Sequence, residues 1–495
     1  MSVTTPFSTT FSTTEPTQDA ELERLLAGVH AAAAPLAALR PAARATLLEA
    51  VADDLDAAGP ELIPVAQSET RLAAARLKGE LKRTTFQLRL FAELLRDGAY
   101  LDARIDHADP EWPMGAPRPD LRRFRTALGP VLVFSASNFP FAFSVAGGDT
   151  ASALAAGCPV LVKAHSGHPE LSRFTAKVVA GALRRAGAPD GTFGLLFGTQ
   201  AGAAALRDDR ITAGAFTGSI PGGRALFDIA ASRPTPIPFF GELGSNNPVF
   251  VTEAASAERG EEIVQGFVGS FTLGSGQFCT KPGTLFVPAG SDLVQRLRDT
   301  ALPDAAPLLN DRIQGGYTEV LQDLERHPHL SVLVQGPEPL ADPPSPTLLL
   351  TTAEDMLADP HALQAECFGP TAVVVTYTDE RQLLELAESF EGQLTATIHG
   401  TEACQVAGLV EILARKAGRV LWNQWSTGVS VTYAQQHGGP YPATTASGST
   451  SVGTAAVERF LRPVAYQGFP QHLLPEALRD ENPLGVPRLV DGRRD

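Results

Sequence analysis

One cysteine of the chain stands in a setting suited to nucleophilic chemistry. Cys279 lies in the segment FTLGSGQFCTKPG, whose glycines allow the backbone to pass close to a ligand. A thiol on such a loop can attack a substrate, whereas a structural cysteine is normally enclosed by large apolar side chains. The other three of the four cysteines are expected to be small core residues: Cys158, Cys367 and Cys404.

Two polar residues lie in segments that could supply the remaining chemistry. Glu242, in FGELGSNNP, has an apolar and glycine-rich setting, where burial would raise the pKa of its carboxyl group and make it a usable general base. The alternative is a partner for a buried cation. Asn138 follows an apolar run in SASNFPFAFS. An amide at the carboxyl end of a parallel strand can donate to a developing oxyanion, or it can simply close a turn.

Five short motifs together resemble one family. SNFP, FTGS, GELGSNNP, GQFCTKPG and CFGP occur in the order, and at the approximate separations, of the aldehyde dehydrogenase superfamily. The closing region, HGGPYPATTASGSTSVGTAAVERFLRPVAYQGFP, is similar to the branch of 2-oxoglutarate semialdehyde (2,5-dioxovalerate) dehydrogenases and related NADP-accepting bacterial enzymes. The resemblance implies that Cys279 attacks an aldehyde and that Asn138 and the Cys279 N–H hold the oxyanion. Glu242 would then activate the water that hydrolyses the thioester.

The resemblance also implies a nicotinamide dinucleotide, although no GxGxxG motif follows the first expected strand. Relatives place six residues around it, which here are Gly218 and Ser219 at the pyrophosphate, Lys163 and Ser166 at the adenine ribose, and Glu366 and Phe368 at the nicotinamide ribose. Many NAD-preferring relatives have a glutamate at the position of Ser166, which would repel a 2′-phosphate. The expected cofactor is therefore NADP, with NAD also usable.

The substrate is less well indicated by the sequence. A semialdehyde with a far carboxylate needs a cation, yet residues 139–149, expected at the pocket entrance, contain no Arg or Lys. The pocket wall is predicted to comprise Phe141, Gln277, Phe278, Trp425 and His437. The leading substrate is 2,5-dioxovalerate, and the alternative is a medium-chain aliphatic or aromatic aldehyde. The presence of Glu242 disfavours a relative that acylates coenzyme A, and that of Cys279 disfavours a non-catalytic protein of this fold.

The elements expected to position these residues are of the α/β class. Residues 21–95 repeat apolar positions at helical spacing. From residue 129, short apolar runs such as VLVF and VLVK alternate with helical segments, which is typical of parallel strands buried on both faces. A second unit with the same alternation starts near residue 244.

The predicted fold is the aldehyde dehydrogenase fold, with a parallel-sheet cofactor-binding domain, an α/β catalytic domain and a small β oligomerisation arm. The predicted ranges are 1–18 for a flexible tail, 19–109 and 129–243 for the cofactor-binding domain, 244–438 for the catalytic domain, 439–459 for a connecting segment, and 110–128 and 460–495 for the arm and C-terminal segment. Because the arm pairs with another subunit in the family, a homodimer or a dimer of dimers is expected.

Composition excludes several other classes of partner. A net charge of −15 disfavours nucleic-acid binding, because a phosphate backbone requires a basic face. No apolar run is long enough to span a bilayer, and no cysteine pair has the CxxC spacing. We therefore expect a cytoplasmic enzyme that acts on a small molecule, without a metal site or a membrane partner.

Overall fold

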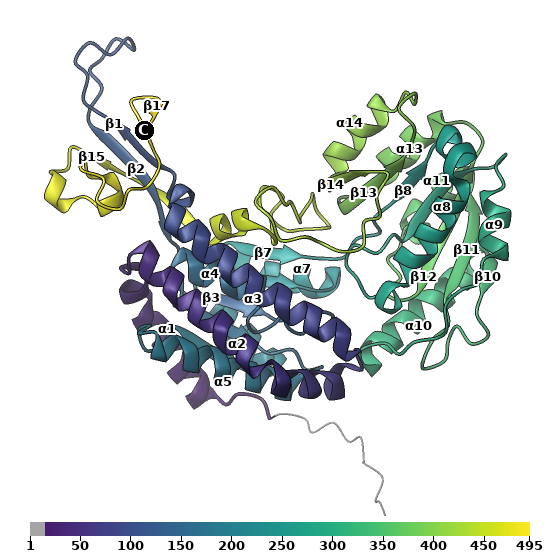
Figure 1. Cartoon of the computed structure of the whole chain (residues 1–495), viewed down its shortest axis with the longest axis horizontal. Coiled ribbons are helices and arrows are strands. Elements are labelled where there is room, and N and C mark those ends of the chain that lie inside the picture. Colours follow the sequence, from purple (N-terminus) through teal and green to yellow (C-terminus); the bar gives the residue numbers. More distant parts are fainter. Residues whose placement is uncertain (1–14) are drawn as a thin grey trace, which may run out of the picture.

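The computed structural model describes residues 15–495, so most of the predicted tail, residues 1–14, lies outside the described residues. Thr17, within the predicted tail, is bound to the fold: its N–H donates to the Phe197 carbonyl at 3.1 Å. Three helices follow, as the periodicity predicts: α1 (Asp19–Ala37), α2 (Pro41–Thr70) and α3 (Ala74–Asp97). Helix α1 packs against the first of two large sheets, and α2 and α3 pack on each other and on helices that cover this sheet (Figure 1).

The first sheet is entirely parallel, in the order β5-β4-β3-β6-β7. Its strands are β3 (Val131–Phe134), β4 (Val160–Lys163), β5 (Phe193–Leu196), β6 (Ala213–Thr217) and β7 (Phe239–Glu242). The connecting helices are α4 (Gly148–Ala156), α5 (Pro169–Arg185), α6 (Thr199–Arg207) and α7 (Ile220–Ala231). Because β4 and β6 lie on opposite sides of β3, the chain reverses direction there and opens a crevice at the carboxyl ends, where ligands bind in such sheets.

The second sheet has the order β10-β11-β12-β9-β8-β13-β14, and only β10 runs antiparallel to its neighbour. Its strands are β8 (Val249–Val251), β9 (Thr284–Pro288), β10 (Ser331–Gln335), β11 (Thr347–Thr352), β12 (Thr371–Tyr377), β13 (Gln393–His399) and β14 (Ala417–Trp422). The helices around it are α8 (Glu253–Thr272), α9 (Leu293–Asp299), α10 (Asp311–Arg326), α11 (Ala353–Ala358), α12 (Pro360–Leu363), α13 (Arg381–Ser389) and α14 (Ala407–Lys416). Residues 243–248 carry the chain from β7 of the first sheet into β8 of the second.

A third sheet forms an arm that extends from the body of the molecule (Figure 1). It contains β15 (Leu461–Gln467), β2 (Leu121–Ala127), β1 (Ala103–Asp106), β16 (Arg488–Val490) and β17 (Arg493–Arg494), in that spatial order. Strands β2 and β15 pair along their whole length, which joins the two expected arm segments. Strand β1 also belongs to this sheet, although its residues fall in the range predicted for the cofactor-binding domain.

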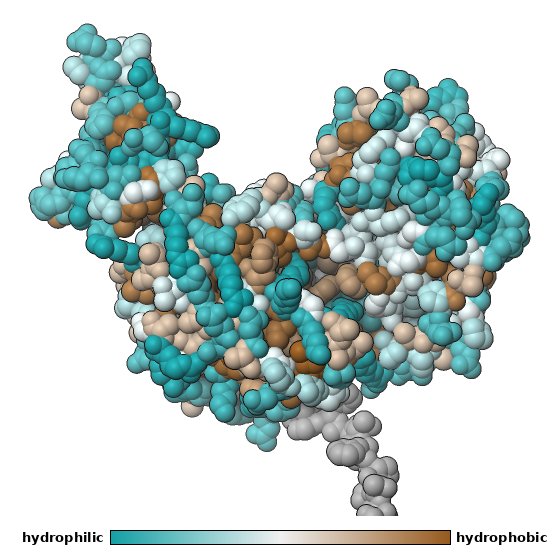
Figure 2. All heavy atoms as spheres, viewed as in Figure 1, coloured by the Kyte–Doolittle hydropathy of each residue, from teal (hydrophilic) through white to brown (hydrophobic). Residues whose placement is uncertain are grey.

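The segment before β15 packs against the first sheet. The N–H of Leu243 donates to the Ala443 carbonyl at 2.8 Å, and the N–H of Gly241 donates to Thr445 Oγ1 at 2.8 Å. Figure 2 shows apolar residues gathered in the hollow between the arm and the part built on the second sheet. Among the helices of residues 15–495, none is both long and apolar enough to cross a membrane.

Candidate active site

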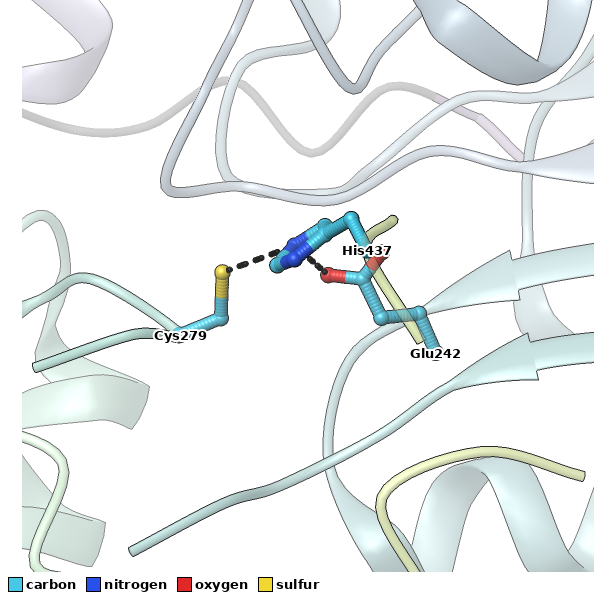
Figure 3. A group of neighbouring side chains, drawn as sticks. All are labelled: Glu242, Cys279 and His437. Atoms are coloured by element: carbon cyan, nitrogen blue, oxygen red, sulfur yellow. Dashed lines mark hydrogen bonds and ion pairs between the residues drawn. The ribbon is translucent and has the colours of Figure 1, made fainter. Parts of the chain in front are cut away.

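A thiol, an imidazole and a carboxylate meet where the chain crosses between the two large sheets (Figure 3). Cys279 Sγ lies 3.6 Å from His437 Nε2, and the same nitrogen lies 2.9 Å from Glu242 Oε1. The other ring nitrogen, Nδ1, is buried without a hydrogen-bond partner among the described residues. In a nucleophile–histidine–carboxylate triad the acid holds the second ring nitrogen. Here the thiol and the carboxylate share one nitrogen, so a proton at that atom can serve either group.

Glu242 ends β7 and is almost completely buried. Its Oε2 accepts a hydrogen bond from Ser451 Oγ. Burial alone would raise the pKa of this carboxyl group, but the nearby His437 and the hydrogen bond from Ser451 outweigh burial, and the pKa lies below its ordinary value. The expectation of a raised pKa is therefore wrong, because the sequence does not show these partners. Glu242 is ionised near neutral pH.

The thiol of Cys279 has the opposite shift. Burial of the sulfur, followed by the negative charges of Glu242 and Glu366, raises its pKa well above the ordinary value. The residue as a whole keeps part of its surface exposed. The thiol is therefore protonated near neutral pH, and its reaction requires a base that removes the proton as the carbon–sulfur bond forms.

The loop that carries the thiol is held by backbone geometry and by one asparagine side chain. Gly276 has a φ of 67°, and a Cβ there would overlap the Gly369 carbonyl oxygen, so only glycine fits. Asn247 Nδ2 donates to the carbonyl oxygens of Cys279, at 2.8 Å, and of Lys281, at 2.9 Å. This role of Asn247 was not predicted from the sequence, because in the segment GELGSNNP only Glu242 was expected to act.

Two of the predicted pocket residues have structural roles instead. The side chain of Gln277 is buried, donates to the Gly274 carbonyl at 3.1 Å and accepts from the Leu309 N–H at 2.9 Å. Phe141 is 1% exposed and belongs to the hydrophobic core under the first sheet. Both side chains are buried inside the protein, so neither lies on an open pocket wall. The expectation that Cys404 is a buried core residue also fails, because it is partly exposed, while Cys158 and Cys367 are buried.

Asn138 lies close to the thiol loop. It follows β3, is buried, and its Nδ2 donates to the Gln277 carbonyl at 3.1 Å, two residues before Cys279. An amide carries two N–H donors, so one remains for a substrate oxygen. The structure thus brings Cys279, Glu242 and Asn138 together, from three segments far apart in the sequence.

Aromatic rings form a row beside this group. Phe278 meets Phe139 edge to face at 5.1 Å between ring centres, and Phe139 meets Phe143 at 5.4 Å. The Phe143 ring lies 6.4 Å from the ring of His437. Trp425 lies elsewhere: its ring packs 4.6 Å from the His399 ring and 6.0 Å from the Phe267 ring. Of the predicted wall residues, Phe278 and His437 are therefore the ones beside the thiol.

Helix α3 contributes three charged residues that sequence reasoning missed. Arg76, Glu80 and Arg83 are spaced four and three residues apart, so they lie on one face of the helix. Glu80 Oε1 accepts the N–H groups of Phe141, at 2.8 Å, and Ala142, at 2.9 Å. Burial raises the pKa of Glu80 to about 6, although these hydrogen bonds and the charges of the two arginines act to lower it. Their spacing along an amphipathic helix was the feature of the sequence that could have indicated a shared role for these three residues.

Arg76 anchors the same segment from α3. Its Nη2 donates to the Asn138 carbonyl at 2.7 Å, and its guanidinium lies over the rings of Phe139 and Phe278, 5.2 and 5.0 Å from their centres. Such cation–π contacts strengthen when they are shielded from water. Helix α3 thus fixes the turn after β3, and with it the amide of Asn138.

The residues expected at the cofactor suit a dinucleotide. Ser219 caps α7, with its Oγ accepting the Gly222 N–H at 3.4 Å, and Gly218 beside it is exposed, so the helix N-terminus is open to an anion. Lys163 ends β4, and its Nζ has no hydrogen-bond or ionic partner among residues 15–495. Ser166 lies exposed in the turn that follows.

The nicotinamide end is expected at Glu366 and Phe368. Burial raises the pKa of Glu366 to about 7, against the charge of Lys281, and the charge of Glu366 is felt by the thiol of Cys279. Phe368 is half-buried two residues later. A carboxylate this close to the nucleophile suits the hydroxyls of a ribose that must deliver its base to the reacting carbon.

The ligand atoms of Glu242, Cys279 and His437 lie within 4.8 Å of one another. Sulfur, nitrogen and oxygen donors at this spacing could also coordinate a soft divalent cation such as Zn²⁺. Such an ion would occupy the atoms needed for nucleophilic chemistry. The geometry therefore predicts competition between metal binding and catalysis at this group, and none of the steps below requires a metal.

The chain is similar to known proteins over most of its length. The aldehyde dehydrogenase family model matches residues 1–462. An alpha-ketoglutaric semialdehyde dehydrogenase of Acinetobacter baylyi is 47% identical over 91% of this chain and 86% of its own, and one of Azospirillum brasilense is 46% identical over 92% and 88%. The crystal structure of lactaldehyde dehydrogenase from Escherichia coli has the same fold, with a TM-score of 0.77 and 20% identity over 92% of both chains. The chain belongs to the aldehyde dehydrogenase family.

Proposed function

We propose that this enzyme oxidises 2,5-dioxovalerate, the semialdehyde of 2-oxoglutarate, to 2-oxoglutarate. The observation that carries the chemistry is the contact of one His437 nitrogen with both the thiol of Cys279 and the carboxylate of Glu242. The substrate is supported by two relatives, each at least 46% identical over at least 91% of the chain, whose names specify this semialdehyde. The buried carboxylate favours hydrolysis of the thioester over transfer of the acyl group to coenzyme A.

Formation of the covalent intermediate uses four side chains. Cys279 Sγ attacks the aldehyde carbon. The thiol proton passes to the pair formed by Glu242 and His437, and His437 Nε2 lies 3.6 Å from the sulfur. The carbonyl oxygen becomes an oxyanion held by Asn138 Nδ2 and the N–H of Cys279. A bound nicotinamide supplies the acceptor for the hydride that leaves the thiohemiacetal carbon.

Hydrolysis of the resulting thioester uses the same base. The pair formed by Glu242 and His437 first releases to solvent the proton that it took from Cys279. It then takes a proton from the attacking water, and the collapse of the tetrahedral intermediate breaks the carbon–sulfur bond. The thiolate leaves and recovers the proton held by the pair, while the remaining proton of the water passes to solvent and the product departs as a carboxylate. Because the pKa of Glu242 lies below its ordinary value, the carboxylate is ionised at neutral pH, so its oxygens are free of the proton that they must accept.

We propose that the enzyme prefers NADP as its cofactor and also accepts NAD. Ser166 is neutral and exposed where a glutamate would repel a 2′-phosphate. The exposed side chain of Arg312 supports this choice, because it adds a second positive charge near Lys163. The pKa of Lys163 is lowered first by burial and second by the charge of Arg312. The turn after β4 meets the start of α10, since a Cβ on Gly167 would lie 3.1 Å from Asn310 Nδ2. Lys163, Ser166 and Arg312 would together face the phosphate.

The arm supports a proposal about assembly. Its sheet projects from the body, and the outer strand β15 carries several exposed positions (Figure 1). A projecting sheet with a free edge is suited to pairing with another subunit. We therefore propose a homodimer or a dimer of dimers, working in the cytoplasm on a small-molecule aldehyde.

A substrate comparison tests the proposed function. With NADP, we expect kcat/KM for 2,5-dioxovalerate to exceed those for hexanal and benzaldehyde by about 10-fold or more, because polar recognition discriminates better than apolar packing. NADPH formation is followed by absorbance, with the Cys279→Ala variant as the blank. A higher kcat/KM for hexanal or benzaldehyde would overturn the proposed substrate, and turnover by the Cys279→Ala variant would overturn the mechanism.

Pre-steady-state kinetics test the shared base. The Glu242→Gln variant should lower steady-state turnover by about 100-fold or more while keeping a burst of NADPH, because hydride transfer precedes the hydrolysis that needs the carboxylate. The His437→Gln variant should slow the burst as well, since the thiol loses its nearest base. Rapid-mixing absorbance measures both phases, and unfolding temperatures control for misfolding. An unchanged burst rate in the His437→Gln variant contradicts this role.

Cofactor preference is tested at Ser166. The Ser166→Glu variant should reduce kcat/KM for NADP relative to NAD by about 10-fold, because the added carboxylate repels the 2′-phosphate. The matched control is Ser166→Thr, which keeps a neutral hydroxyl and should keep the ratio. Initial rates with both cofactors at a fixed aldehyde concentration supply the measurement. A ratio that does not move in the Ser166→Glu variant would place the 2′-phosphate elsewhere.

A further inference from the structure

The site contains a cation that the mechanism does not use. Arg83 lies on α3, is half-buried, and places its guanidinium 5.3 Å from the centre of the Phe143 ring. Among residues 15–495, no group accepts a hydrogen bond from this guanidinium and no carboxylate forms an ion pair with it. Glu80, one turn earlier on the helix, directs its Oε1 to the N–H groups of Phe141 and Ala142 instead.

The other cations near the thiol each donate to backbone carbonyls. Arg76 donates to the Asn138 carbonyl between two aromatic rings. Arg419 Nη2 donates to the carbonyls of Ser426, at 2.8 Å, and Gly428, at 3.1 Å. The Nζ of Lys281 donates to two backbone carbonyls, those of Cys367 and Thr371, at 2.8 and 2.6 Å. Arg76 Nη1 and Arg419 Nε also lack a hydrogen-bond partner, but both side chains are anchored to backbone carbonyls. Among residues 15–495 near the thiol, Arg83 is therefore a cation whose whole guanidinium is without a hydrogen-bond or ionic partner.

Arg83 lies at a suitable distance for a short dicarboxylic semialdehyde. Phe143 stands between it and His437, whose ring is 6.4 Å from that of Phe143. After burial and the charge of Glu80, the charge of Glu242 also acts on the pKa of the Arg83 guanidinium, so the guanidinium lies within electrostatic reach of the catalytic carboxylate. The terminal carbons of a five-carbon semialdehyde are about 5 Å apart in an extended chain with bonds of about 1.5 Å.

We propose that Arg83 binds the carboxylate of the substrate at the far end of the pocket and selects aldehydes that end in a carboxylate. This inference rests on the proposed function. It supplies the carboxylate-binding cation that residues 139–149 at the pocket entrance lack. A guanidinium presents paired N–H donors that match the two oxygens of a carboxylate. The Phe143 ring, stacked against the guanidinium, would hold it in place and line the path of the methylene groups.

A matched pair of aldehydes separates this role from the identity of the substrate. Pentanal and 5-oxopentanoate have the same chain length and differ by the terminal carboxylate. In the Arg83→Gln variant, we expect the ratio of kcat/KM for 5-oxopentanoate to that for pentanal to fall by about 10- to 100-fold, the range for one charged hydrogen-bonding partner. The Arg83→Lys variant, which keeps the charge without the fork, should restore part of the ratio.

The control is Lys82→Gln, which removes the same charge from the neighbouring, exposed position on α3 and should keep the ratio. An unchanged ratio in the Arg83→Gln variant, or an equal fall in the Lys82→Gln variant, would overturn the proposal. The proposed function fails separately, if the unsubstituted enzyme does not prefer 2,5-dioxovalerate to 5-oxopentanoate. In that case the carboxylate contact of Arg83 is still tested by the ratio of kcat/KM for 5-oxopentanoate to that for pentanal.

Discussion

A single imidazole nitrogen, His437 Nε2, connects the two reactive side chains of this enzyme. It lies 2.9 Å from Glu242 Oε1 and 3.6 Å from Cys279 Sγ, and its ring is buried. The shorter contact to the carboxylate keeps Glu242 ionised, while the negative charge of Glu242 raises the pKa of the nearby thiol. The resting site therefore has an anionic base and a neutral nucleophile, and chemistry begins when the proton leaves sulfur.

The fold brings these groups together by passing the chain from one sheet into the other. Glu242 closes β7 of the first sheet, Asn247 lies in the crossing segment, and Asn247 holds the carbonyl of Cys279 ahead of β9. His437 and Ser451 arrive from the segment that returns along β7. Helix α3 fixes the turn that carries Asn138 through Arg76. Each catalytic side chain is thus anchored by a different element, which limits its freedom before substrate binds.

The alternation of apolar runs and helical segments was sufficient to predict a parallel first sheet and a second α/β unit, although it did not show that β10 of the second sheet is antiparallel. The family motifs singled out Cys279, Glu242 and Asn138 as the expected catalytic residues. The sign of the Glu242 pKa was not predictable, because it depends on His437 and Ser451, which pack against Glu242 only in the folded chain. The uncommitted cation at Arg83 was missed for a similar reason. It lies on a helix that precedes the sheets, and only the docking of α3 brings it beside Phe143.

The rate of Cys279 alkylation by iodoacetamide as a function of pH, measured on the enzyme without cofactor or aldehyde, tests the central claim most directly. Because the thiolate is the reacting form and the pKa of the thiol is raised, the account predicts a slow rate at neutral pH that is still rising with pH above the usual range of a thiol. Subtraction of the rate for the Cys279→Ala variant isolates this cysteine. A rate that reaches its plateau below pH 7 would contradict the account, since it would show a thiolate paired with the imidazolium of His437.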